Sequence, residues 1–217
     1  MTIPKLHYIS QGSTPKEHLE NIQKACASGA ELVQLRLKDF PAGKSEKKIL
    51  KVANEAREIT SHFQTRLLIN ESYKIAKEVK ADGVHLEGTA SCPTLARTHL
   101  YTWQIIGGTA NTLQDCETLL RKEVDYISLG PFRSASTKDN SPTILGLNGY
   151  TAIIEALKTN TPIIGFGGIT TEDVSDILET GITGIAISEE ITRDFNSIGI
   201  FNQLLSASSI DEQRHTF

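Results

Sequence analysis

Three features are scarce or missing in this chain of 217 residues: cysteines, long apolar runs and an excess of positive charge. The three cysteines are scattered and show no CxxC spacing, which argues against a disulfide framework or a zinc site and fits reduced thiols. No run of about 18 apolar residues occurs, so the sequence predicts no membrane span. The net charge of −4 argues against a nucleic-acid-binding surface.

The first ten residues, MTIPKLHYIS, lack a charged segment followed by an apolar one. We therefore expect no secretory signal and a cytoplasmic protein. Hydrophobic residues make up 39% of the chain, which is enough for a proper core. Because the overall charge is negative, any anionic ligand must be held by a local group of cations.

Short apolar runs alternate with amphipathic helical patterns along the whole chain, in eight strand–helix units with no linker between them. Strict alternation implies a parallel sheet, and eight units imply a closed barrel. We therefore predict a single α/β domain over residues 1–208, a (β/α)8 TIM barrel, with a loose polar tail over residues 209–217. The alternative, an open doubly wound sheet, would need a GxGxxG fingerprint that Ser10–Pro15 does not supply. The expected strands are Leu6–Ser10, Glu31–Leu35, Arg66–Ile69, Gly83–Leu86, Gln104–Ile106, Val124–Leu129, a seventh at Ile163–Ile164, and Gly184–Ile187, and the closing helix is Asn196–Ala207.

The stretch Thr161–Thr170, TPIIGFGGIT, combines a strand with a glycine-rich turn. Ile163 and Ile164 are typical of a strand buried on both faces, and Gly167 and Gly168 follow soon after. Glycines at the carboxyl end of a strand let a backbone approach a ligand closely, and exposed N–H groups there suit a phosphate. The alternative is a tight strand-to-helix turn without a ligand.

Gln34, Arg36 and Lys38 follow the second strand at alternate positions, so they share one face of an extended segment. The planar arginine fork beside a mobile lysine charge suits a diphosphate. The alternative is an ordinary charged loop, salt-bridged to Asp39. Because a glutamine and an arginine buried at a barrel mouth need partners, we favour the diphosphate site.

Asn70 and Glu71 follow the third strand, and His85 and Glu87 lie at the end of the fourth. An amide beside a carboxylate can hold a phosphate and a metal ion together, although Asn70 could equally cap a helix. For His85 we favour a core histidine whose hydrogen bonds are satisfied. Because Mg²⁺ is held by few carboxylates plus substrate phosphates, we expect a Mg²⁺ site at Glu71 or Glu87.

Hydroxyls and one further cation follow the later strands. Thr109 comes after the fifth strand, and Ser188 after the eighth, where Glu189 follows it. The loop Gly130–Leu145 is the longest, which suggests a lid or a binding loop, although its polar composition also fits a plain surface loop. With the glycine turn, these groups suggest two anion sites and hence a pair of substrates. The loop carries Ser134, Ser136, Thr137 and Lys138.

Several short motifs occur in a fixed order between about Leu6 and Ile191. They are QLRLK (Gln34–Lys38), IN (Ile69–Asn70), ADGVHL (Ala81–Leu86), IIGGT (Ile105–Thr109), DYISLGPF…STK (Asp125–Lys138), LGLNG (Leu145–Gly149), PIIGFGGI (Pro162–Ile169) and GIAIS (Gly184–Ser188). The ordered series resembles the thiamine phosphate synthase family, which also includes the thiazole tautomerases. The resemblance implies a TIM barrel that joins hydroxymethylpyrimidine diphosphate to a thiazole phosphate, forming thiamine phosphate and releasing diphosphate.

The resemblance also implies a role for each matching residue. Cations together with Mg²⁺ would stabilise the departing diphosphate, and these cations are Arg36, Lys38 and Lys138. The pyrimidine diphosphate would be held by Gln34, Arg36, Lys38, Asn70 and Lys138, with Thr109 where the family usually has a serine. The thiazole phosphate would be held by Thr137, by the Gly167–Gly168 backbone, and by Ser188 in place of the family serine that aligns with Glu189.

Three positions depart from the family pattern in ways that bear on the chemistry. Glu71 replaces the first metal aspartate, and the second falls at about Ala90, so Glu87 is the nearby acid that could replace it. Asn111 stands where the tautomerase branch has a histidine, and an amide cannot transfer protons as an imidazole does.

Three hypotheses follow. The leading one is a thiamine phosphate synthase, a transferase; the second is a thiazole tautomerase-like isomerase; the third is a non-catalytic binder of phosphorylated thiamine precursors. As partners we expect small phosphorylated substrates, no nucleic acid and no membrane, and we consider a homodimer.

Overall fold

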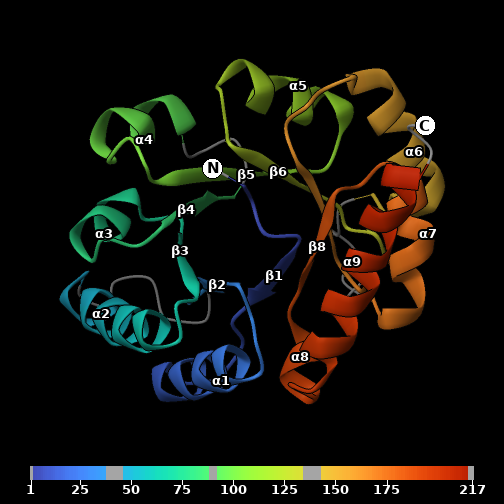
Figure 1. Cartoon of the computed structure of the whole chain (residues 1–217). Helices are drawn as coiled ribbons and strands as arrows, with labels where there is room; N and C mark the ends of the chain where they lie inside the picture. The colour runs from blue at the N-terminus through green and yellow to red at the C-terminus, as the bar shows by residue number, and fades with distance from the viewer. Residues whose placement is uncertain (1, 38–45, 88–91, 134–142, 215–217) are drawn as a thin grey trace.

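Eight parallel strands close into one barrel in the computed structural model, which describes residues 2–37, 46–87, 92–133 and 143–214, with the backbone alone from residue 208. Each strand pairs with the next in chain order, and β8 pairs back with β1 (Figure 1). The predicted (β/α)8 TIM barrel is confirmed. The strands are β1 (Leu6–Ile9), β2 (Leu32–Leu35), β3 (Arg66–Asn70), β4 (Gly83–Leu86), β5 (Ile105–Ala110), β6 (Tyr126–Leu129), β7 (Ile163–Phe166) and β8 (Gly184–Ile187).

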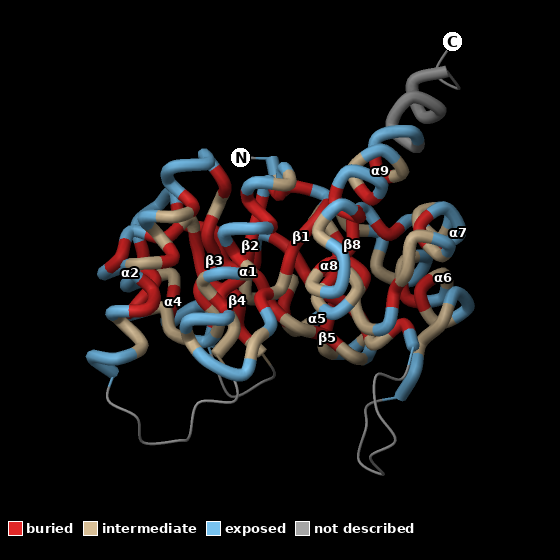
Figure 2. The backbone as a smooth tube through the Cα atoms, turned by 90° about the horizontal axis from the view of Figure 1, so that it is seen from below, coloured by how far each residue is buried: buried red, intermediate tan, exposed pale blue. Residues whose placement is uncertain are grey.

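The helices lie outside the strands and cover the barrel wall (Figure 1). Figure 2 shows the strands as buried backbone and the outer turns of the helices as exposed. The helices are α1 (Pro15–Ala27), α2 (Glu46–His62), α3 (Tyr73–Glu78), α4 (Pro93–His99), α5 (Leu113–Arg121), α6 (Gly146–Leu157), the short 3₁₀ helix η1 (Thr171–Asp173), α7 (Val174–Glu179), α8 (Glu189–Arg193) and α9 (Ser197–Arg214).

Two C-terminal segments differ from the sequence-based expectation. The short helix α8 was not predicted and begins directly after β8, at Glu189. Helix α9 extends to Arg214, so the loose tail expected from residue 209 is wrong as far as that residue. The reason is intrinsic propensity, because the stretch after Ala207 includes glutamate, glutamine and arginine, which are good helix formers. No helix in the described part of the chain has the length and apolar character of a membrane span.

Side-chain caps set where several helices start and therefore where the loops of the barrel mouth end. The Thr14 hydroxyl accepts the Glu17 N–H at 3.2 Å, next to Pro15 in the first helical turn. Thr112 and Asp115 form a reciprocal capping box at the start of α5. These caps satisfy N–H groups that a helix start otherwise leaves without partners.

The two-residue period of the strands separates two apolar layers. Side chains that point outward, such as Val33 and Leu35, pack against the helices, whereas Leu32 and Leu68 belong to a smaller cluster inside the barrel. Two residues after these inner leucines come Gln34 and Asn70, on the same inward face. The alternation that fills the amino end of the barrel with apolar groups therefore brings polar groups to its carboxyl end. The inner cluster is Leu32, Leu68, Ile105, Tyr126, Ile164 and Ala186.

Candidate active site

An amide pair joins the carboxyl ends of β2 and β3. Gln34 Nε2 donates a hydrogen bond to Asn70 Oδ1 at 2.5 Å, and Gln34 is only 3% exposed. The sequence predicted that both residues belong to the site, and the structure places them in contact. Because the Asn70 oxygen is occupied by Gln34, the Nδ2 donor of Asn70 points the other way. The pair thus has a fixed orientation before any ligand arrives.

Arg36 lies where three strand ends meet. Its backbone N–H donates to the Ser10 hydroxyl at 3.1 Å, and its side-chain Nε donates to Glu87 Oε1 at 2.8 Å. The buried Ser10 hydroxyl also contacts His18 Nδ1 at 2.9 Å. Arg36 is therefore anchored from β1 through its backbone and from the end of β4 through its guanidinium.

Glu71 has an unusual backbone conformation for a residue other than glycine, with φ at +65°. The Ser72 N–H bonds back to the Asn70 carbonyl at 2.8 Å, which closes a γ-turn around Glu71. Its own N–H donates to the His85 carbonyl at 2.8 Å, and its carboxylate accepts the Glu87 N–H. Strained conformations of this kind cost about 1–3 kcal/mol and cluster at functional sites. Here the turn brings the Glu71 carboxylate against the backbone N–H of Glu87, the other predicted metal ligand.

A buried hydrogen-bonded chain leads from β6 through β4 to β5. His85 Nδ1 contacts the Tyr126 hydroxyl, and His85 Nε2 contacts Thr109 Oγ1, each at 2.8 Å. Burial, followed by the nearby Asp125 charge, raises the pKa of Tyr126 well above its ordinary value, so the phenol keeps its proton. The interpretation of His85 as a buried histidine with satisfied hydrogen bonds is confirmed, and the chain fixes the Thr109 side chain.

The bare backbone of Gly107 makes room for this chain. A Cβ built on Gly107 would lie 2.1 Å from a ring carbon of Tyr126, well inside van der Waals contact. Tyr126 therefore needs a glycine on the neighbouring strand if its hydroxyl is to reach His85.

A pocket of about 370 Å³ opens beside Asn70 and Glu71, between β2, β3, α2 and α3. Its lining is mostly apolar, with the polar residues Asn70, Glu71 and Ser72 at one side. The apolar lining residues are Leu35, Leu37, Ile49, Ile69 and Ile75.

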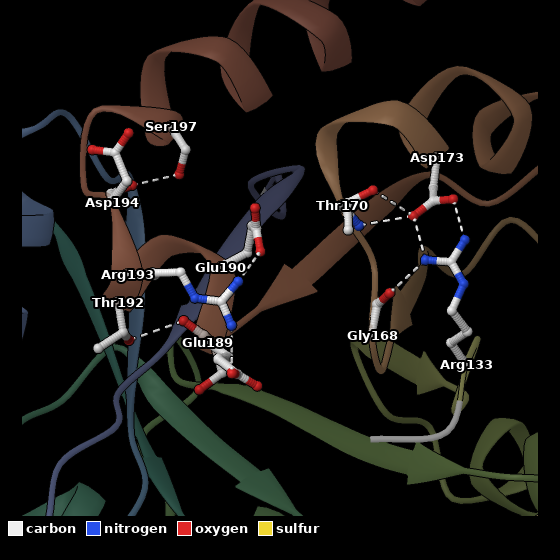
Figure 3. Close-up of polar contacts among 11 residues, drawn as sticks. Arg133, Gly168, Thr170, Asp173, Glu189, Glu190, Thr192, Arg193, Asp194 and Ser197 are labelled. Atoms are coloured by element: carbon white, nitrogen blue, oxygen red, sulfur yellow. Dashed lines mark hydrogen bonds and ion pairs between the residues drawn. The ribbon is translucent and has the colours of Figure 1, made fainter. Parts of the chain in front are cut away.

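The glycine turn after β7 has the predicted form. Gly167 and Gly168 both have positive φ, at +97° and +67°, and Gly168 is exposed. After β8, the Ser188 hydroxyl donates to the Ile9 carbonyl at 2.9 Å, so its proton is used within the protein. Glu189 is paired with Arg193 at 2.6 Å (Figure 3), which offsets the negative charge where the family has a serine.

Lys38, Thr137 and Lys138 lie outside the described residues, so their predicted roles stay predictions. Ser10, Tyr126 and Arg133 belong to this end of the barrel or support it, and the sequence interpretation did not select them. The sequence contained part of the information needed to select these residues. Ser10 directly follows β1 and Arg133 lies in the loop after β6, where functional groups of such barrels gather, whereas Tyr126 has the sequence pattern of an ordinary core residue.

A closed eight-stranded barrel with an amide pair, an arginine–glutamate pair and glycine turns at its carboxyl end defines a TIM barrel with a small-molecule site at that end. A model of the thiamine monophosphate synthase family matches residues 6–191. The chain belongs to this family.

Relatives from two genera support the assignment. The thiamine-phosphate synthase of Flavobacterium psychrophilum is 39% identical over 203 residues, which cover 92% of this chain and 97% of the relative. The thiamine-phosphate synthase of Bacteroides thetaiotaomicron is 38% identical over 192 residues, covering 87% of this chain and 90% of the relative. Both relatives are therefore matched over nearly their full length.

Among solved structures, a thiamine phosphate pyrophosphorylase from Pyrococcus furiosus superposes with a TM-score of 0.77 at 22% identity, covering 94% of this chain and 96% of the other. At that level of identity the superposition supports the barrel fold and no more.

Proposed function

We propose that the protein is a thiamine-phosphate synthase, a transferase that condenses hydroxymethylpyrimidine diphosphate with thiazole phosphate and releases diphosphate. The observation that carries the proposal is the Gln34–Asn70 pair at the carboxyl ends of β2 and β3, with Arg36 two residues beyond Gln34, in a chain of this family. These are the residues for which the family resemblance implies binding of the pyrimidine diphosphate.

The chemistry asked of this side of the mouth is stabilisation of a leaving diphosphate. Arg36, Lys38 and Lys138 would supply positive charge where negative charge develops as the carbon–oxygen bond breaks. The fork of Arg36 suits bidentate contact with phosphate oxygens, and the lysines act as point charges. Gln34, Asn70 and Thr109 would orient the same substrate through hydrogen bonds, supported by the fixed geometry of the amide pair and of His85.

The second substrate would bind at the opposite side of the mouth. The N–H groups of Gly167 and Gly168, in a turn with positive φ, suit a phosphate monoester. Thr137 would add a hydroxyl. Ser188 can contribute only as an acceptor, or after giving up its bond to Ile9, because its proton is already donated.

Mg²⁺ would be held by few carboxylates together with substrate phosphates. The described residues contain no group of three or more His, Cys, Asp or Glu side chains that could hold a metal ion by themselves. Glu71 and Glu87 are in contact, because the Glu71 carboxylate accepts the Glu87 backbone N–H, and each would offer one hard oxygen donor to Mg²⁺ beside the substrate phosphates. When bound, the ion would neutralise charge on the diphosphate. Glu87 would be a metal ligand through part of its carboxylate only, because one of its oxygens also accepts a hydrogen bond from Arg36.

The isomerase alternative lacks its proton-transfer group. Asn111, at the position of the tautomerase histidine, donates through Nδ2 to the Gly130 carbonyl at 2.5 Å, so its amide holds the loop after β6. A cytoplasmic location and a homodimer stay predictions, as does the absence of nucleic-acid and membrane partners.

A mixing assay tests the proposed function. Purified protein receives the pyrimidine diphosphate, the thiazole phosphate and Mg²⁺, and thiamine phosphate is followed by mass spectrometry. We expect product above the no-enzyme control, lost when the metal is chelated. Binding of both substrates without product would instead favour the non-catalytic binder.

Glu71→Gln should raise the Mg²⁺ concentration needed for half-maximal activity roughly tenfold, because the substitution removes one of few charged oxygen donors. The measurement is a Mg²⁺ titration of initial rate at saturating substrates. Glu78→Gln is the matched control, since Glu78 is exposed at the last position of α3, at the end of that helix away from Glu71. An identical titration for Glu71→Gln and the control would remove Glu71 from the metal site.

A further inference from the structure

Three consecutive carbonyls of the glycine turn accept hydrogen bonds from the segment that follows β6. The Phe132 N–H donates to the Phe166 carbonyl at 2.7 Å, and the Arg133 N–H donates to the Gly167 carbonyl at 2.9 Å. The Arg133 guanidinium then donates to the Gly168 carbonyl at 3.0 Å (Figure 3). The hydrogen bonding between β6 and β7 therefore continues beyond the strands. Its last hydrogen bond comes from the Arg133 side chain instead of the backbone.

This pattern determines where the N–H groups of the turn point. In a planar trans peptide the C=O and the N–H of the same unit point in opposite directions. Since the carbonyls of Gly167 and Gly168 face Arg133, the N–H groups of Gly168 and Ile169 face away from it. Neither N–H donates a hydrogen bond to another residue in the described part of the chain. They are therefore available to an anion.

Asp173 holds the guanidinium from the far side of the turn. Arg133 NH2 and NH1 contact its two carboxylate oxygens at 2.5 and 2.9 Å, a bidentate pair. The same carboxylate accepts the backbone N–H and the hydroxyl of Thr170 at 2.9 and 2.8 Å. Partial burial by itself raises the pKa of Asp173, but the hydrogen bonds from Arg133 and Thr170 outweigh it, and the pKa lies below its ordinary value.

The turn and the segment after β6 are also in close steric contact. A Cβ on Gly167 would come within 2.6 Å of Pro131 Cβ, and one on Gly168 within 2.8 Å of Arg133 Cβ. The glycines are thus needed for this approach as well as for their positive φ. Any displacement of Arg133 is transmitted to the turn through contact and through hydrogen bonds.

We propose that Arg133 and Asp173 are positioning residues for the monophosphate subsite: their ion pair holds the Gly168 carbonyl, so that the N–H groups of Gly168 and Ile169 stay directed at the phosphate. The proposal rests on the proposed function for the identity of that phosphate, which is the thiazole phosphate. Neither residue contacts the substrate. Loss of the Arg133–Asp173 ion pair should therefore weaken the binding of the thiazole phosphate and leave the binding of the pyrimidine diphosphate unchanged.

Arg133→Lys is the diagnostic variant, because lysine keeps the charge but cannot bridge two carboxylate oxygens and a carbonyl with one fork. Arg97→Lys is a matched control. Arg97 also bonds a carbonyl, that of Gln104 at 2.8 Å, and a carboxylate, that of Asp125 at 2.6 Å. The two partners of Arg97, Gln104 and Asp125, come just before β5 and β6, so this arginine lies at the opposite end of the barrel.

Titration calorimetry with each substrate separately measures the effect without turnover. We expect Arg133→Lys to weaken thiazole phosphate binding roughly tenfold, which corresponds to one poorly oriented charge-assisted contact, and to leave binding of the pyrimidine diphosphate within about twofold. Asp173→Asn should also weaken thiazole phosphate binding. Arg97→Lys should change the binding of neither substrate. In steady-state assays, the KM for thiazole phosphate should rise in parallel.

Equal weakening of both substrates by Arg133→Lys, or no change for thiazole phosphate, would overturn the positioning role. So would a wild-type protein that does not bind thiazole phosphate. A wild-type protein that binds both substrates but forms no thiamine phosphate would refute the proposed function, while the calorimetric comparison would still decide the role of Arg133.

Discussion

Replacing Arg36 with alanine should lower kcat/KM for the pyrimidine diphosphate by about 10²–10³, equivalent to roughly 3–4 kcal/mol of transition-state stabilisation. The guanidinium of Arg36 is held by Glu87 at 2.8 Å, and the backbone N–H of Arg36 is held by the Ser10 hydroxyl. A cation fixed in this way loses little entropy when charge develops on the departing diphosphate. Arg36→Lys keeps the charge without the fork, so its loss should be intermediate.

Steady-state rates with varied pyrimidine diphosphate at saturating Mg²⁺ measure the Arg36 effect. Arg57→Ala serves as the control, since Arg57 forms an equally close ion pair, 2.6 Å to Asp82, before β4 at the other end of the barrel. Loss of either pair costs some stability, but only Arg36 lies at the carboxyl end of the barrel, where we propose that the substrate binds. A kcat/KM for Arg36→Ala within about threefold of the control would mean that Arg36 is not a diphosphate ligand.

Acidification below about pH 6.5 should destabilise the fold through His7, and His7→Gln should remove that part of the loss. His7 lies on β1 inside the barrel, 1% exposed, with Nε2 donating to the Pro4 carbonyl at 3.0 Å. Its ring meets Tyr126 edge-on at 5.0 Å. Burial, assisted by repulsion from His85 and opposed by the bond to Pro4, lowers the pKa of His7 to about 3.

The direction of the His7 effect follows from proton binding. Between about pH 6.5 and pH 3 the unfolded chain protonates this histidine and the folded chain does not, so the free energy of unfolding falls as the pH falls. The slope is about 1.4 kcal/mol per pH unit once the pH is well below 6.5. Above that pH the contribution is constant.

Urea unfolding at about pH 7.5, 5.5 and 4.5 measures the acid sensitivity of the wild type and of His7→Gln. Glutamine offers an N–H to the Pro4 carbonyl but takes up no proton. His62→Gln, an exposed position at the end of α2, is the control and should keep the wild-type slope. Equal slopes for His7→Gln and the wild type would show that His7 accepts a proton without cost.

The sequence could predict the positions of polar residues where they depended on periodicity along a single strand. Gln34 and Arg36 were predicted to share a face because alternate residues of a strand point the same way, and Asn70 was predicted to follow directly after the third strand. The structure adds that Gln34 and Asn70 are in contact. The loose tail expected after residue 209 was wrong up to Arg214, because adding residues to a helix that has already formed is easier than starting one.

Partners far apart in the chain could not be predicted, because barrel closure and strand register decide them. Glu87 was considered only as a metal ligand, yet it holds Arg36, 51 residues earlier. Arg133 and Asp173 are 40 residues apart and meet because β6 and β7 are neighbours with their loops in contact. Tyr126 reaches His85 only because Gly107 lies between their strands without a side chain.

The sequence by itself determined the eight strand–helix units, the apolar layers and the set of polar residues at the strand ends, because each depends on local periodicity and propensity. Only the tertiary structure decided which of these polar residues touch. Closure of the sheet places strand ends side by side regardless of their distance in the chain, and the hydrogen bonds that orient Arg36, Thr109 and the glycine turn all cross between strands or their loops.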